Sequence, residues 1–144
     1  MSGDDDPLAD DHRLVARSWY LIAIRDVRSA EACLAATAPI PETAAYHCQQ
    51  AVEKLFKGLL VMSRIAFRKT HDLEALRDLV VPRFPDLADA IDRLVPITDW
   101  GHVFRYPDLG AEPVPSPSEL QFVLSDILLF SERVILVIDP VVSK

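Results

Sequence analysis

The sequence predicts an all-α protein, an up-and-down bundle of about five helices, and three observations lead to this prediction. Apolar residues recur at helical steps of three and four, and no stretch longer than a few residues alternates as a strand would. Glycine occurs only four times in 144 residues, which leaves little material for tight hairpins or phosphate-binding loops. Prolines and capping residues separate the periodic segments.

Composition and charge limit the classes of protein. A chain of 144 residues, half of them hydrophobic, fits one domain. We expect residues 1–12 to form a flexible acidic N-terminus and residues 13–140 to form a single helical domain. With a net charge of −7, the protein lacks the overall positive charge that is typical of a general nucleic-acid binder. A local basic groove is still compatible with this charge. The N-terminus lacks a signal-peptide pattern and charges interrupt the most apolar stretch, so we expect a cytoplasmic protein without a membrane segment.

The first two helices follow from apolar periodicity. The first should end before Pro39, with a face made of Leu14, Trp19, Ile22, Ala23, Val27, Ala30 and Leu34. The second should run from Pro41 to about Arg64, with a buried stripe made of Ala45, Cys48, Val52, Leu55, Leu59 and Met62. A different stripe of that helix holds His47, Gln50, Lys54 and Lys57. Cys33 and Cys48 have no paired spacing, so we expect buried free thiols.

Start signals place the later elements. Thr70 can cap a short helix over about residues 72–81, and Pro85 opens a fourth helix that Pro96 limits. Residues 97–117 are proline-rich and aromatic, which predicts a long loop. Ser116, Pro117 and Glu119 form a capping box that starts a final helix running to about Ile138. Its polar stripe is so narrow that it must be either the central helix or also a dimer interface.

The chemistry-bearing motifs are few. The chain has no glycine-rich phosphate loop, no His-Glu-x-x-His, no Cys-x-x-Cys and no Gly-x-Ser-x-Gly. The histidines and Cys48 fall on different elements, so neither a metal site nor a cofactor is expected.

Several polar residues are candidates for binding. His47 borders the buried stripe of its helix and can face a cleft or bond to a backbone carbonyl. His71 and Arg68 stand at a helix start, where an anion is favoured, but an exposed basic loop explains them as well. Trp100, Arg105 and Tyr106 can clamp a base or a phosphate, or pack their loop onto the bundle.

Several stretches together resemble a prokaryotic HEPN domain over about residues 13–138. They are "WYLIAIRDVRSA", "AAYHCQQAVEKLFKGLL", "THDL", "RYPD" and "SPSELQFVLSDILLFSERVI". The resemblance implies a five-helix bundle, commonly a homodimer, often paired with a minimal nucleotidyltransferase in a two-component, toxin–antitoxin-like system. In family members that are RNase toxins, an Arg, four to six intervening residues and a His lie at the dimer cleft.

This chain departs from that signature. Only two residues separate Arg68 from His71, whereas eight separate Arg93 from His102. We therefore expect a non-catalytic binding and assembly module, homodimeric, with a nucleotide- or RNA-phosphate-binding groove formed by His47, Lys54, Arg68, His71 and Arg105. Trp100 and Tyr106 would stack or shape the groove. The alternatives are an RNase toxin with a degenerate site of Arg93 and His102, and a purely structural helical dimer.

Overall fold

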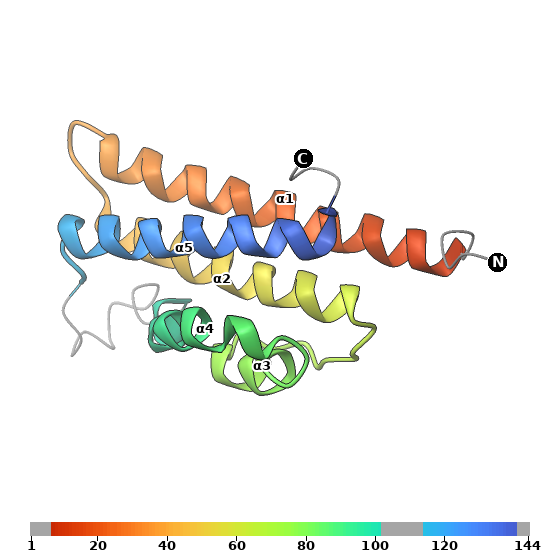
Figure 1. The fold of residues 1–144 in the computed structure, drawn as a ribbon. Coiled ribbons are helices and arrows are strands. Elements are labelled where there is room, and N and C mark those ends of the chain that lie inside the picture. Colours follow the sequence, from red (N-terminus) through yellow and green to blue (C-terminus); the bar gives the residue numbers. More distant parts are fainter. Residues whose placement is uncertain (1–6, 102–113, 141–144) are drawn as a thin grey trace.

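The computed structural model describes residues 7–101 and 114–140, and it confirms the predicted all-α bundle. Helices α1 (Pro7–Ala35) and α2 (Pro41–Met62) form a long antiparallel pair, and α5 (Pro117–Ile138) packs along both (Figure 1). The shorter helices α3 (Leu73–Val80) and α4 (Ala88–Leu94) lie at one side of this layer, together with the 3-10 segments η2 (Pro85–Leu87) and η3 (Val95–Gly101). The described residues contain no strand.

Helix α2 is the centre of the bundle. More than half of its residues are buried, and it contacts α1, α3, α5 and η3. Its predicted stripe is confirmed from Ala45 to Leu59, whereas Met62 is half-buried. Phe56 packs edge-to-face on Phe130 of α5, with ring centroids 5.8 Å apart. Helix α2, and not α5, is therefore the central helix among the described elements, and a dimer interface on α5 stays a prediction.

The predicted face of α1 is only partly right. Ala23, Val27, Ala30 and Leu34 are buried, but Leu14 and Ile22 are 62% and 42% exposed. Helices α2 and α5 cover only a narrow strip of the α1 surface. Apolar residues beside that strip therefore face away from the core. Helix α1 also begins at Pro7, inside residues 1–12, which we expected to be a flexible N-terminus. The start of the domain at residue 13 stays a prediction.

The start of α3 differs from the prediction in its cap. Asp72, not Thr70, is the N-cap residue, and its carboxylate accepts from the Glu74 N–H at 3.0 Å. The Thr70 hydroxyl instead accepts from the N–H of Asp72, the residue just before the helix, at 3.1 Å. His71 therefore precedes the helix rather than standing in its first turn. An Asp at the cap also places a negative charge at the positive end of the helix dipole.

The long loop predicted over residues 97–117 begins later than expected. Residues 97–101 belong to η3, in spite of Pro96, because proline fits the first turn of a helix. Thr98 of η3 accepts from the Leu73 N–H at 2.9 Å and so ties this segment to the start of α3. Residues 102–113 of that loop lie outside the described residues, and residues 114–116 are irregular up to the start of α5.

The bounds predicted for α5 are confirmed. Ser116 is its N-cap and accepts from the Glu119 N–H at 3.2 Å. On the side away from the core, Phe122, Leu129 and Leu136 are 71%, 61% and 46% exposed. We call these three residues the α5 ridge. Among the described helices, none is both long enough and apolar enough to cross a bilayer.

Candidate functional site

The polar stripe predicted on α2 begins with a three-residue cluster that joins α2 to α1. Asp26 of α1 is nearly buried, and its two carboxylate oxygens face different partners on α2. One oxygen lies 2.9 Å from Nδ1 of His47, and the other accepts from Nζ of Lys54 at 2.5 Å. The two α2 residues are seven apart, so they lie on one side of the helix, two turns from each other. One carboxylate therefore fixes both the imidazole and the ammonium group.

A second carboxylate cluster lies on α2 next to the α2–α3 connection. Glu53 is only 2% exposed, and its Oε1 lies 2.7 Å from Nδ1 of His71 and 3.2 Å from Nζ of Lys57. Lys57 also sits over the ring of Trp19 on α1, 5.6 Å from the ring centroid. In both clusters a carboxylate faces Nδ1 of a histidine, which leaves Nε2 for solvent or a ligand.

Glutamine side chains complete the polar stripe and fix the loop that carries His71. The Gln49 Nε2 donates to the backbone oxygen of His71 at 3.0 Å, and Gln50 Nε2 donates to Gln49 Oε1 at 2.7 Å. Gly101 packs directly against Gln49, because a Cβ at Gly101 would lie 2.7 Å from Gln49 Oε1. The backbone and the ring of His71 are thus held by two different residues of α2.

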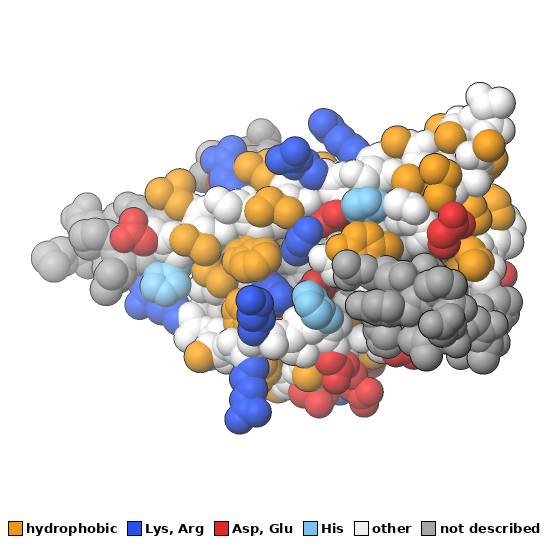
Figure 2. Space-filling view, turned by 180° about the vertical axis from the view of Figure 1, so that it is seen from behind, with side chains coloured by type: hydrophobic (Ala, Val, Ile, Leu, Met, Phe, Trp, Pro, Cys, Tyr) orange, Lys and Arg blue, Asp and Glu red, His pale blue; other side chains and the backbone are white. Residues whose placement is uncertain are grey.

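Charge is distributed unevenly over the molecule in spite of its net charge of −7. Residues 7–71 carry nine Lys and Arg against six Asp and Glu, whereas the described residues from 72 to 140 carry four against eleven. Figure 2 shows a face on which Lys and Arg side chains gather around histidine rings. The α1–α2 pair and the α2–α3 connection therefore form the positive side of an acidic protein.

The structure brings together only part of the predicted phosphate groove. His47 and Lys54 meet at Asp26, and His71 lies at the neighbouring Glu53 cluster. Arg68 is exposed in the α2–α3 connection and makes no ion pair with another described residue. Trp100 is partly buried against the core at the end of η3. Arg105, Tyr106 and His102 lie outside the described residues, so their roles stay predictions.

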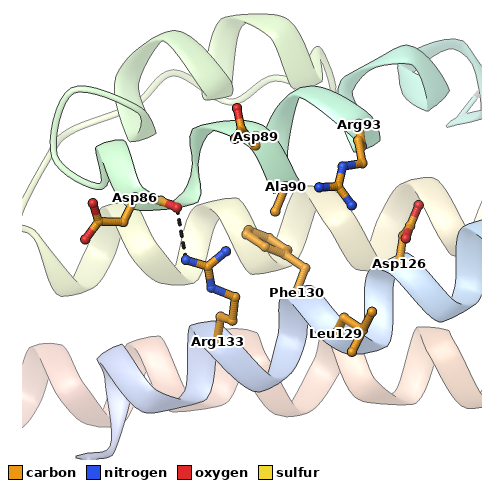
Figure 3. A pocket seen from close by; sticks show the side chains of 8 residues that line it. All are labelled: Asp86, Asp89, Ala90, Arg93, Asp126, Leu129, Phe130 and Arg133. Carbon is orange, nitrogen blue, oxygen red and sulfur yellow. Dashed lines mark hydrogen bonds between the residues drawn. The ribbon is translucent and has the colours of Figure 1, made fainter.

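Arg93, the other residue of the alternative RNase site, lies elsewhere. It lines a pocket of about 320 Å³ between α4 and α5, with Arg133, Asp126 and Phe130 among the other lining residues (Figure 3). Figure 3 shows the Arg93 side chain reaching from α4 toward α5, on the same side as Asp126. Arg133 closes the other end by donating from Nη2 to the backbone oxygen of Asp86 at 2.9 Å. This pocket carries charges of both signs.

Sequence reasoning missed the two carboxylates that organise the site. Asp26 interrupts an apolar helix face, and Glu53 precedes Lys57 by four residues, so a polar partner for each could be suspected. Their histidine partners are 21 and 18 residues away in the sequence. Helix periodicity predicts contacts only between residues three or four apart, so it could not predict these pairs. Among the described residues, no three His, Cys, Asp or Glu side chains group closely enough to hold a metal ion.

The fold and the site define an all-α bundle in which two carboxylate–histidine–lysine clusters join the central helix α2 to α1 and to the α2–α3 connection. The family model of the HEPN domain matches residues 16–136. The chain therefore belongs to the HEPN domain family, as its sequence indicated. No curated protein and no solved structure gives a significant match to the chain.

Proposed function

We propose that this protein is a non-catalytic HEPN binding and assembly module that works as a homodimer and partners a minimal nucleotidyltransferase in a two-component, toxin–antitoxin-like system. The observation that carries this proposal is the α5 ridge. Its three large apolar side chains are spaced by seven residues and span roughly 21 Å along the helix. An apolar stripe of that length on a surface helix is typical of a protein–protein interface.

The spacing of the α5 ridge favours a second copy of the chain as the occupant. A seven-residue apolar repeat suits helix–helix packing at a crossing angle of about 20°, as in coiled coils. Two copies of one ridge can pack on each other about a two-fold axis, because such an interface uses the same patch on both subunits.

Light scattering on two charged variants tests the dimer. Phe122→Glu and Leu129→Glu place a carboxylate on the ridge, where the side chains are more than half exposed and the monomer should still fold. The control Gln121→Glu adds the same charge to an exposed position of the same helix beside the ridge. We expect a dimer for the wild type and the control, and monomers for both ridge variants. A wild-type monomer at micromolar concentration would refute the dimer.

Phosphate binding is the second part of the proposal, and the positive side of the molecule supports it. Lys54 is paired with Asp26, and Lys57 is paired with Glu53. A phosphate bound at either lysine would therefore compete with that carboxylate. Arg68 has no such competitor among the described residues.

We expect ATP or a short RNA to raise the melting temperature and release heat on titration. Arg68→Ala should weaken both signals, whereas Arg83→Ala, an exposed arginine after α3, should not. A protein that gives neither signal would be the purely structural dimer.

The absence of catalysis is tested directly with RNA. Metal-independent cleavage needs an acid–base group and a cation beside the scissile phosphate. Here Arg93 lies between α4 and α5, and its sequence distance from His102 exceeds the family signature. We expect purified protein to leave RNA intact. Cleavage that is lost in both Arg93→Ala and His102→Ala would establish the degenerate RNase instead. We expect a minimal nucleotidyltransferase to be encoded beside this chain, and co-purification of the two proteins would test the partnership.

A further inference from the structure

A groove lies between the α2–α3 connection and α3, away from the residues used so far except Arg68. Its volume is about 380 Å³, and its lining is largely apolar, with Phe67, Leu76 and Leu79 among the lining residues. Leu76 is fully buried and forms part of the floor, whereas Leu79 is 37% exposed. A groove of this size and lining can take one large aliphatic or aromatic side chain.

The backbone beside the groove is free to bond to another chain. The connection is irregular between Ile65 and His71, and none of the N–H or C=O groups of residues 66–69 bonds to another described residue. An extended segment laid along an unpaired backbone gains hydrogen bonds that do not depend on its sequence, while a side-chain pocket supplies selectivity.

The charge beside the groove selects the sign of the ligand. Arg68 lines the groove and Lys69 follows it, and both are exposed without an ion pair to another described residue. No acidic residue occurs from Ser63 to His71, and on α3, which forms the other wall, Asp78 pairs with Arg77 at 3.1 Å while Glu74 lies in the first turn. Carboxylates on either side of an apolar anchor would therefore meet unpaired cations.

We infer that this groove binds an extended segment of another protein that carries one large apolar side chain flanked by acidic residues. The side chain enters the groove against Leu76 and Leu79, the carboxylates face Arg68 and Lys69, and the backbone pairs with residues 66–69. This surface is separate from the α5 ridge, so it allows the protein to hold a partner while dimerised. Arg68 serves both this site and the proposed phosphate site, whereas Leu79 serves only this one.

Selection from a random peptide library on the immobilised full-length protein tests the inference, with the Leu79→Glu variant as counter-selection. We expect enriched peptides to combine a leucine or phenylalanine with neighbouring carboxylates. In fluorescence anisotropy their affinity should fall at least tenfold on Leu79→Glu and on Arg68→Glu, but stay within twofold on Arg83→Glu. ATP binding should survive Leu79→Ser, which removes the apolar contact without placing a carboxylate beside Arg68 and so separates this inference from the proposed phosphate site.

Three outcomes would overturn the inference. The first is a library in which no peptide prefers the wild type over Leu79→Glu. The second is enrichment of peptides that keep their affinity when the apolar residue is replaced by serine, because charge alone would then explain binding. The third is a variant lacking residues 1–6 that binds the peptides more than tenfold tighter, which would assign the groove to the acidic N-terminus of the chain itself.

Discussion

Nδ1 of His71 lies 2.7 Å from Oε1 of Glu53, although the His71 side chain is 76% exposed and the Glu53 side chain only 2% exposed. A loop histidine at the surface is thus tied to a carboxylate in the interior. The same carboxylate holds Lys57, whose side chain is 9% exposed. Burying this acid costs desolvation that only its partners offset, so the position of His71 depends on the core of α2.

Removing the buried carboxylate should destabilise the fold. In Glu53→Ala the Lys57 ammonium group loses its acceptor inside the protein, and we expect the free energy of unfolding to fall by about 3 kcal/mol. Urea denaturation measures this change. Glu31→Ala removes an exposed glutamate of α1 and should have little effect, and a double variant Glu53→Gln, Lys57→Met should recover part of the loss. An equal loss from Glu31→Ala would contradict the role of Glu53.

Adding a methyl group at Gly101 should disturb the loop that carries His71. The new Cβ would lie 2.7 Å from Oε1 and 2.8 Å from Cδ of Gln49, which is fully buried and holds the His71 backbone. We expect Gly101→Ala to lower the free energy of unfolding by roughly 1–3 kcal/mol, as overpacking does. Amide hydrogen exchange should speed up at residues 70–73. Unchanged exchange there would show that Gln49 moves aside without releasing the loop.

The same substitution at Gly58 should have the opposite sign. This glycine lies inside α2, and an added Cβ would meet its nearest neighbours at 3.4–3.5 Å, which is ordinary contact. Alanine is favoured over glycine in a helix interior by up to about 1 kcal/mol. Gly58→Ala should therefore leave the melting temperature unchanged or raise it. A lower melting temperature would mean that α1 and α2 are packed too closely there to accept a methyl group.

The two cysteines should differ in reactivity. Burial raises the pKa of the Cys48 thiol from 9.0 to about 12, whereas Cys33 is only half-buried. Because the thiolate is the reactive species, iodoacetamide at about pH 8 should modify Cys33 well before Cys48 in the folded protein. Mass spectrometry of digested protein gives the order. Equal rates for the two thiols would show that the core around Cys48 opens readily.

The raised pKa of Cys48 also predicts a dependence of stability on alkaline pH. The folded state keeps the proton on Cys48 up to about pH 12, whereas the unfolded chain releases it near pH 9. The protonated thiol thus contributes stability that is complete below pH 9 and is lost as the pH rises through 12. Cys48→Ala should be less stable at neutral pH but should lose less stability across this window. Parallel pH profiles for the two proteins would contradict this assignment.

Signals from neighbouring residues in the sequence predicted the helices. They did not predict the features that depend on contacts between residues far apart in the sequence. Pro41 and the Ser116 cap placed the starts of α2 and α5, because capping depends on adjacent residues. Leu14 and Ile22 fit the helical period but are exposed, since periodicity does not say how wide a face its neighbours cover. His47, Lys54 and His71 were identified as candidates, yet Asp26 and Glu53 were missed because their pairing depends on how α1, α2 and the connection meet.

The uneven distribution of charge gives the molecule an electric dipole between the α1–α2 pair and the rest of the bundle. The net charge of −7 repels a polyanion, but the positive side repels it least, so we expect the protein to approach it with that side turned toward it. Collisions should then favour the orientation that presents the α2–α3 connection. Added salt shortens the range of this field to about 8 Å at physiological ionic strength, so it should weaken this preference for one orientation.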